Sequence, residues 1–588
     1  MTNEGARLIA PTSHSWYTAE TNCKEAFIDS CWRYRIRILM ASTLTILVIV
    51  IFVVVTHLVS VTTSNNDYSY EKDPTYWRNV AQSELETALK DRNRGVAKNI
   101  ILFLGDGMGP TTVTAGRIHA GQLRGLKGEE YKLSFDQFPY TGLSRTYNVD
   151  SQITDSAASG TAYLTGVKTN QGVLGLSGAV TRANCASTEG AQVDSILRWS
   201  IAAGKSTGVV TTTRITHATP AASYSHSADR DWESDRNIPY VEKKCEDIAL
   251  QLITRNRDIN VLMGGGRAYF YPEGYPDPDP APGFDTNKVS RQDRRNLIQE
   301  WKNDKAMKGL SHKFVYNKEQ LDSVNLVKTD YLLGLFQQDH MSYELDRDTI
   351  KEPSIAEMTQ KAIEILKKNK HGYFLLVEGG KIDQGHHDSL AHYALSELVA
   401  MNEAVDVAKK LTDETDTLIV VTADHSHVMN IAGYANRGSP ILGLSNQEEK
   451  QLDKKPYTTI LYGTGPGYNI PRANLTGVDT ANKTYVFQSA VPTSSETHGG
   501  EDVNIYASGP QSFLYTGVHE QNYIPMVMAY ASCVGPYSSG GKPCARDQVS
   551  TVPGQSKSSN NGSPVDVVPH VTVIFMVCLL HLTFTEHL

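Results

Sequence analysis

Five short apolar runs limit what this 588-residue chain can fold into more than any other feature of its sequence. Such runs are typical of strands that are buried on both faces of a sheet. They cover residues 99–104, 206–211, 261–263, 373–377 and 417–422. Stretches with helical periodicity lie between them, at 192–203, 354–368 and 390–411. We therefore expect an α/β fold in which a large central, mostly parallel sheet is flanked by helices on both faces.

A stretch rich in Gly and Asn, residues 433–491, interrupts this pattern. Asn474 and Asn482 each begin an Asn-x-Thr sequence, the acceptor for N-linked glycans, so both are expected in surface loops of an exported protein. We predict that residues 433–491 form a small surface insertion in a body that spans residues 76–545.

An uncharged apolar segment at residues 38–59 is long enough to cross a bilayer. Three arginines directly precede it, so the positive-inside rule keeps residues 1–37 in the cytoplasm and exports the chain beyond a polar linker at 60–75. Two interpretations stay open, because the segment suits both a retained transmembrane anchor and the apolar part of a long cleaved leader.

The C-terminal end has the composition of a lipid-anchor signal. A polar linker at residues 546–563 contains small residues, and a hydrophobic stretch at 564–588 follows it. Such a tail is removed when a glycolipid is attached at a small residue, here expected between Asn560 and Ser563. The two ends together predict a protein of the cell membrane whose body lies on the extracellular face.

Cysteine usage agrees with export. Four of the seven cysteines lie in the body, and an even set in an oxidising compartment suits two disulfides. Cys533 and Cys544 flank a short, turn-rich loop, so we pair them with each other. This choice pairs Cys185 with Cys245.

The charge balance excludes one class of partner. The chain has 56 basic and 64 acidic residues, a net charge of −8, and no long basic block. A nucleic-acid-binding surface needs a clustered basic footprint, so we expect no nucleic-acid partner. An anionic substrate must instead be held locally, by metals or by a few arginines.

Three of the apolar patterns end in an acidic residue: Asp106, Glu378 and Asp424. In open α/β sheets the ligand crevice lies outside the carboxyl ends of the strands, so these three carboxylates should converge. A single acid at such a position is more often a capping or ion-paired residue. Three of them together favour a functional site.

Histidines near these acids indicate a metal site. The proposed donors lie close together in short segments or follow the end of a predicted strand. These donors are Asp383, His387, Asp424, His425, His427 and His498. Carboxylate and imidazole donors without thiolates are typical of catalytic zinc sites. So many donors favour a centre with two metal ions.

Ser156 is the candidate nucleophile, because it follows Asp155 at the start of a helix of very small side chains. The N–H groups and the dipole of a helix N-terminus stabilise an anion. Serine needs a base or a metal to become a good nucleophile, so this hypothesis depends on the metal site. For the segment alone, an ordinary capping role is the better explanation.

A further segment supplies more polar groups. Thr219 offers an oxygen ligand, His217 is close to it in sequence, and Arg230 offers a guanidinium that can bind two phosphate oxygens at once. Taken alone, Arg230 would more often form a surface ion pair.

These motifs, in this order, resemble those of the animal alkaline phosphatases over most of the chain, from about residue 76 to residue 543. The matching motifs lie at residues 105–109, 155–158, 217–220, 229–230, 383–387, 424–427 and 496–499. The resemblance implies an alkaline-phosphatase-like sheet with a crown-like insertion, a homodimer, and two zinc ions and one magnesium ion in each subunit.

The resemblance also assigns roles. The ligands that it implies for the first zinc are Asp383, His387 and His498. Those for the second zinc are Asp106, Asp424 and His425. Those for magnesium are Asp106, Thr219 and Glu378. Asp155, Gln384 and His427 are expected behind these ligands.

The implied reaction is the hydrolysis of small phosphomonoesters. Ser156 attacks phosphorus in line, Arg230 holds the phosphate with His217 nearby, and activated water then hydrolyses the phosphoserine to release inorganic phosphate.

Two positions depart from the family pattern. Gln384 stands where mammalian members usually have His and bacterial members have Lys, which affects rate and pH optimum more than reaction class. Phe336-Gln337 aligns with a Phe-Glu pair of the mammalian calcium site, so calcium binding stays open, with Asp279 and Glu352 as the remaining acids.

Other classes fit less well. A sulfatase or a nucleotide phosphodiesterase shares acid-terminated strands and metals, but it would carry a formylglycine precursor or a threonine as nucleophile in place of Ser156. A surface receptor built on an inactive phosphatase scaffold would have lost a metal ligand, and this sequence keeps all of them.

Overall fold

The computed structural model describes residues 92–445, 451–538 and 544. The predicted segments 1–37, 38–59, 60–75, 546–563 and 564–588 lie outside the described residues. No helix in the described parts of the chain combines the length and the apolar character that a membrane crossing needs.

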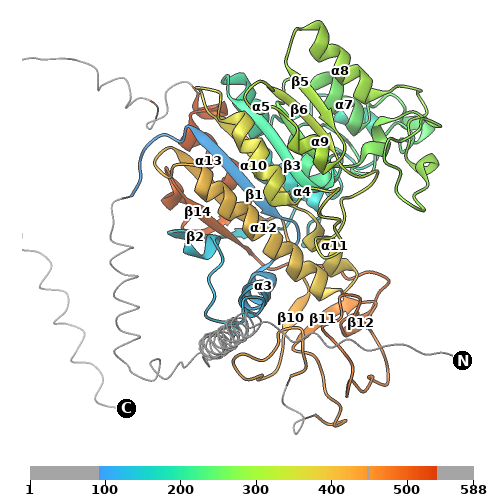
Figure 1. Cartoon of the computed structure of the whole chain (residues 1–588), viewed down its shortest axis with the longest axis vertical. Coiled ribbons are helices and arrows are strands. Elements are labelled where there is room, and N and C mark those ends of the chain that lie inside the picture. Colours follow the sequence, from blue (N-terminus) through green and yellow to red (C-terminus); the bar gives the residue numbers. More distant parts are fainter. Residues whose placement is uncertain (1–91, 446–450, 539–543, 545–588) are drawn as a thin grey trace, which may run out of the picture.

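A ten-stranded sheet forms the centre of the molecule, in the order β15-β2-β14-β8-β1-β7-β3-β4-β6-β5 (Figure 1). Its strands are β1 (Asn99–Gly105), β2 (Tyr140–Arg145), β3 (Ser206–Arg214), β4 (Val261–Gly265), β5 (His312–Val315), β6 (Tyr331–Leu335), β7 (Tyr373–Gly379), β8 (Thr417–Ala423), β14 (Val503–Ser508) and β15 (Gly517–Glu520). The five apolar runs are β1, β3, β4, β7 and β8, so these strand predictions are confirmed.

Only β14 among these ten strands runs against its neighbours, since it pairs antiparallel with both β2 and β8. The other pairings in the sheet are parallel. The predicted mostly parallel α/β sheet is therefore confirmed. Parallel strands need crossover connections, and helices supply several of them here.

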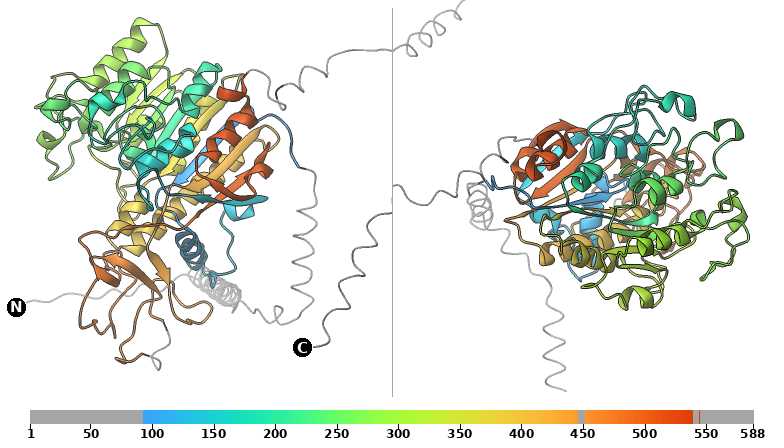
Figure 2. Two further views of the ribbon diagram at one scale, coloured as in Figure 1. Left: turned by 180° about the vertical axis from the view of Figure 1, so that it is seen from behind. Right: turned by 90° about the horizontal axis from the view of Figure 1, so that it is seen from above.

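Helices cover both faces of the sheet (Figure 2). One layer contains α3 (Pro110–Gln122), α10 (Ile355–Leu366) and α12 (Ala391–Leu411), and the opposite layer contains α4 (Ser156–Thr165), α5 (Ile196–Ala202) and α13 (Tyr523–Ser532). Alternate residues of β1 pack into different cores, with Leu102 and Leu104 in one and Ile101 and Phe103 in the other. This two-sided burial explains why the strand is apolar throughout.

Further helices connect the remaining elements: α6 (Ala218–Ala221), α7 (Ile248–Arg255), α8 (Leu297–Met307), α9 (Lys318–Asp322) and α11 (Lys381–His387). The helices expected at 192–203, 354–368 and 390–411 are α5, α10 and α12, with ends that differ by at most four residues.

The insertion has a sheet of its own (Figure 1). Its strands are β10 (Met429–Ile431), β11 (Ile460–Gly465) and β12 (Ser489–Pro492), and its core packs on α3 and α12. A two-stranded ladder of β9 (Ser426–His427) and β13 (His498–Gly499) lies beside it in the chain. Asn474 and Asn482 are both exposed.

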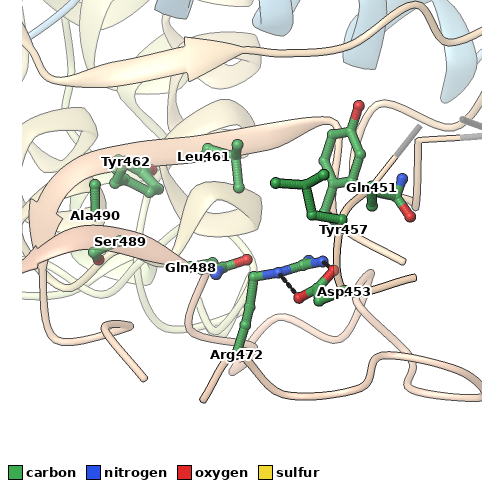
Figure 3. Close-up of a pocket in the computed structure, with 10 residues that line it drawn as sticks. Gln451, Asp453, Tyr457, Leu461, Tyr462, Arg472, Gln488, Ser489 and Ala490 are labelled. Atoms are coloured by element: carbon green, nitrogen blue, oxygen red, sulfur yellow. Dashed lines mark hydrogen bonds and ion pairs between the residues drawn. The ribbon is translucent and has the colours of Figure 1, made fainter. Parts of the chain in front are cut away.

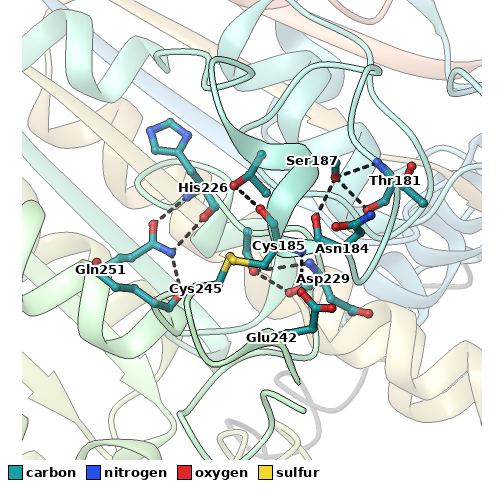
Figure 4. Close-up of a disulfide and its surroundings, with 12 residues drawn as sticks. Thr181, Asn184, Cys185, Ser187, His226, Asp229, Glu242, Cys245 and Gln251 are labelled. Atoms are coloured by element: carbon teal, nitrogen blue, oxygen red, sulfur yellow. Dashed lines mark hydrogen bonds between the residues drawn. A yellow bond between two sulfur atoms is a disulfide. The ribbon is translucent and has the colours of Figure 1, made fainter. Parts of the chain in front are cut away.

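The two disulfides join Cys185 with Cys245 and Cys533 with Cys544, as predicted. The first one joins two loops 60 residues apart in sequence (Figure 4). Beside it, Glu242 accepts a hydrogen bond of 2.8 Å from the backbone N–H of Cys185.

Candidate active site

Three adjacent strands bring the predicted acids together. β1 lies between β7 and β8 in parallel register, and Leu104 of β1 pairs with Glu378 of β7. Asp106 directly follows β1, and Asp424 directly follows β8. The three carboxylates are completely buried, and they lie at the carboxyl ends of the strands, where ligands bind in open α/β sheets.

The turn after β1 depends on a glycine. Gly107 has a φ of +69°, and a Cβ at this position would lie 2.4 Å from the ring of His427. Its backbone N–H donates a hydrogen bond of 2.9 Å to Asp424. Because only glycine combines this φ with so close an approach, the turn holds Asp106 and Asp424 side by side.

Ser156 is the first residue of α4, and its oxygen faces two of the predicted ligands. Oγ lies 3.3 Å and 3.4 Å from the two carboxylate oxygens of Asp106, and 3.3 Å from Nε2 of His425. Asp155 caps the helix by accepting a hydrogen bond from the N–H of Ala158. The first N–H groups of α4 therefore favour negative charge at Ser156.

Acids and histidines of the described residues form four overlapping groups, and in each group the candidate ligand atoms lie within 4.8 Å of one another. The groups are Asp383 with His425, His427 and His498; Asp106 with Asp424 and His425; Asp106 with His217 and Glu378; and His387 with His427 and Glu496. Side chains from segments up to almost 400 residues apart therefore meet at one place.

The first predicted zinc set lies where the site is most open. Nε2 of His498 lies 3.2 Å from Nε2 of His387 and 3.4 Å from Oδ1 of Asp383. Both histidines are half-buried, whereas Asp106, Asp424 and His425 are completely buried. Solvent therefore reaches the site from the side of His387 and His498.

The electrostatics of the site fit a cation. Burial, and then the charge of Asp424, raise the pKa of Asp106 well above its usual value. Burial raises the pKa of Glu378 to about 8. Oε1 of Glu378 and Nδ1 of His217 are buried and have no hydrogen-bond partner among the described residues. Divalent cations would compensate these groups, and the mixture of oxygen and nitrogen donors is what zinc and magnesium sites use.

His427 holds Asp383 from behind. Its Nε2 lies 2.7 Å from Oδ1 of Asp383, and its Nδ1 lies 2.5 Å from Oε2 of Glu496. Burial alone would lower the pKa of His427, but the hydrogen bonds to these two carboxylates raise it to about 10. His427 thus lies between two carboxylates and orients a predicted ligand.

Arg230 lies beside the helix start that carries Ser156. Its Nη1 donates a hydrogen bond of 2.9 Å to Asp155, and its Nη2 lies 3.3 Å from Nε2 of His217. Burial would raise the pKa of Asp155, but the charge of Arg230 and two backbone hydrogen bonds lower it overall. The pair places a fixed guanidinium next to the candidate nucleophile, a geometry that suits phosphate.

Comparisons with known proteins agree with this geometry. A family model described as alkaline phosphatase matches residues 97–534. The chain belongs to the alkaline phosphatase family. It is therefore a metal-dependent enzyme that hydrolyses phosphomonoesters.

Two relatives of this phosphatase are the tissue-nonspecific alkaline phosphatases of Gallus gallus and Homo sapiens. The first is 51% identical over 486 residues, which cover 81% of this chain and 93% of the relative. The second is 51% identical over 472 residues, which cover 79% and 90%. A cold-active alkaline phosphatase of Shewanella is similar in structure, with a TM-score of 0.51, 25% identity, and coverage of 74% of this chain and 99% of that chain.

Gln384, the first departure from the family pattern, takes part in a polar network of this phosphatase. Its Oε1 accepts a hydrogen bond of 2.9 Å from Lys381, and its Nε2 lies 3.0 Å from Nε2 of His340. The ring of His340 packs edge-on against His217, with 5.2 Å between the ring centroids. The side chain of Gln384 therefore forms hydrogen bonds with Lys381 and with His340, a neighbour of His217.

The second departure is at the aligned calcium site, where Asp279 and Glu352 are the remaining acids. Gln337 and Ser342 donate hydrogen bonds to the carboxylate of Glu352, so its oxygens already have partners. Asp279 is exposed on a loop, and neither acid belongs to a candidate metal group of the described residues. Calcium takes six to eight oxygen ligands, of which two carboxylates supply at most four.

Several groups at the site were not assigned from the sequence. Glu496 is completely enclosed, yet it lies in a polar loop and no strand end marks it. Thr211 and Thr213 of β3 both hydrogen-bond to Oε2 of Glu378. The sequence marks the two threonines only indirectly. They extend the apolar run of β3, and the strand that pairs with it, β7, carries the acid Glu378.

Proposed function

We propose that this phosphatase uses two zinc ions and one magnesium ion and that it forms a phosphoserine intermediate on Ser156. The observation that carries the proposal is the position of the Ser156 oxygen, at 3.3 to 3.4 Å from Asp106 and His425. Both neighbours belong to the same candidate metal group. A hydroxyl that shares its contacts with metal ligands is in the position where a cation activates it.

The proposed ligand sets keep the assignments made from the sequence. Asp383, His387 and His498 would hold one zinc, and Asp106, Asp424 and His425 the other. Asp106 would also contribute to the magnesium site, together with Thr219 and Glu378. When bound, the metals supply Lewis acidity, which favours deprotonation of a hydroxyl or a water molecule and neutralises phosphoryl charge.

Side chains of the protein carry out phosphoryl transfer and bind the phosphate. The oxygen of Ser156, which lies 3.3 Å from both Asp106 and His425, loses its proton to solvent and bonds to phosphorus while the bond from phosphorus to the alcohol oxygen breaks. The alcohol oxygen takes up a proton, and the alcohol leaves. Arg230, held by Asp155, donates to phosphate oxygens as their charge develops. Water then displaces Ser156 from phosphorus, the serine oxygen regains a proton, and inorganic phosphate leaves.

Replacement of the nucleophile tests this proposal. For Ser156→Ala we expect kcat for p-nitrophenyl phosphate to fall by at least about 10³-fold, because the variant loses the hydroxyl that contacts both Asp106 and His425. Acid-quenched wild-type protein should carry phosphate on the peptide that contains Ser156. The control is Ser200→Ala, which removes a buried hydroxyl of α5 far from the predicted ligands.

Substantial turnover by Ser156→Ala, with thermal unfolding unchanged, would contradict the covalent route. It would favour direct attack by water at the same metals.

We also propose that the folded body is an ectodomain, attached to the outer face of the cell membrane by a glycolipid and paired as a homodimer. The two disulfides and the exposed acceptor residues Asn474 and Asn482 support an oxidising, exported environment. The proposed segment boundaries remain those drawn from the sequence, with the body at 76–545 and the insertion at 433–491.

A further inference from the structure

Tyr462 of β11 lies between a cavity of the insertion and the active site. Its side chain forms part of the wall of a cavity of about 540 Å³, near Leu461 and Tyr457 (Figure 3). Its hydroxyl lies 2.9 Å from Nδ1 of His386, which belongs to the same helix, α11, as the proposed ligands Asp383 and His387.

The side chain of His386 is held between two other elements, β11 and α3. On one side it contacts Tyr462 of β11, and on the other its Nε2 lies 3.1 Å from Oγ1 of Thr112 in α3. The imidazole is completely buried, so no solvent replaces a contact that is lost. Because each ring nitrogen has one partner, the ring has one preferred orientation.

The orientation of His386 matters to the site through His427. The two rings pack with 4.8 Å between centroids and 37° between planes. His427 in turn lies 2.7 Å from Oδ1 of Asp383. A continuous series of contacts therefore runs from Tyr462 through His386 and His427 to a proposed zinc ligand.

We propose that Tyr462 is a positioning residue through which the insertion fixes the zinc set of Asp383, His387 and His498. Without the hydroxyl, Nδ1 of His386 is left buried without its partner, an unfavourable state that ring rotation or local opening relieves. Either movement loosens the packing behind His427 and Asp383. This inference rests on the proposed function, since it concerns ligands assigned there.

The test compares zinc retention in two tyrosine-to-phenylalanine variants. Tyr462→Phe keeps the ring and its packing, and removes only the hydroxyl that contacts His386. We expect zinc to transfer from this variant to a chromogenic chelator about 10-fold faster than from wild type, the lower end of the effect of groups that orient metal ligands. The matched control is Tyr393→Phe, which removes the hydroxyl of another buried tyrosine, in α12, that donates to Asp346 at 2.7 Å.

A double-mutant cycle adds a readout that general destabilisation would not move. If Tyr462 acts through His386, zinc release from Tyr462→Phe combined with His386→Phe should be no faster than from His386→Phe alone. Thermal unfolding of the metal-free proteins reports separately whether a variant is less stable.

Two outcomes overturn the inference in distinguishable ways. The role of Tyr462 is overturned if zinc leaves Tyr462→Phe, Tyr393→Phe and wild type at the same rate. It is also overturned if the effects of Tyr462→Phe and His386→Phe on zinc release are additive. Either result leaves the proposed function intact. Wild-type protein that holds no zinc overturns the proposed function, and the role of Tyr462 with it.

Discussion

At the scale of single residues, the site is organised by pairs in which one side chain fixes another. Asp155 caps α4 and holds Arg230, and His427 holds Asp383. The fixed partner in each pair is the one that meets substrate or metal in the proposed mechanism. Rigid placement of such groups is what turns their charge into transition-state stabilisation.

Arg230→Lys tests the phosphate contact, because lysine keeps the charge but loses the planar pair of donors. The loss of one charged hydrogen bond, worth about 1.5–3 kcal/mol, should lower kcat/KM and raise the inhibition constant of inorganic phosphate, each by roughly 10- to 100-fold. Steady-state kinetics with p-nitrophenyl phosphate measure both constants. Arg182→Lys is the control, since Arg182 also binds an aspartate, Asp229, but on a more exposed part of the surface. Unchanged phosphate inhibition in Arg230→Lys would remove Arg230 from the site.

At the scale of elements, α3 and α12 pack together around a buried histidine pair. His119 of α3 is 5% exposed and meets His392 of α12 edge-on, with 5.4 Å between ring centroids. Burial, and then the nearby His392, lower the pKa of His119 to about 4. The folded protein therefore keeps His119 neutral at a pH where the unfolded chain takes up a proton.

This contact makes the α3–α12 packing sensitive to acid. Between the usual histidine pKa of about 6.5 and the folded value, protons bind His119 only in the unfolded state, so stability falls as pH falls. Because the pKa of His119 falls to about 4, we expect the free energy of unfolding to decrease by about 3 kcal/mol as the pH falls from about 6.5 to about 4. The full decrease is reached only below this range of pH. His119→Phe keeps an aromatic ring but cannot bind a proton, so its free energy of unfolding should not show this decrease.

Urea unfolding of both proteins at a series of pH values measures the difference. The exposed His371, replaced by Gln, serves as the control. Parallel stability curves for wild type and His119→Phe would contradict the assignment.

The elements also show how far sequence patterns reach. The buried parallel strands and their terminal acids could be predicted, because burial on both faces leaves an apolar run that ends abruptly at Asp106, Glu378 and Asp424. The antiparallel β14, its neighbour β2 and the edge strand β15 could not, because none of these three strands is buried throughout and none leaves a continuous apolar run. The contact of Gln384 with His340 joins residues distant in sequence, and nothing in either segment marks it.

At the scale of the whole molecule, one question is whether a glycolipid holds the chain at the cell surface, as proposed. Treatment of intact cells with a phospholipase specific for phosphatidylinositol should release the activity into the medium, because a glycolipid would be the only anchor once the segment 38–59 has been cleaved as a leader. Activity that stays with the membrane would instead show that the segment 38–59 is retained.

The whole molecule also explains why the site exists only in the folded state. The proposed metal ligands come from β7, from α11 and from the segments that follow β1 and β8. They meet His498 at the carboxyl ends of the central strands.

The central claim is that metal ions held at this site activate Ser156. Its most direct test is a zinc titration of the metal-free protein in the presence of magnesium, with activity measured at each step. We predict no turnover without zinc and full turnover at two zinc ions per chain. Full activity of protein shown to contain no metal would contradict the account.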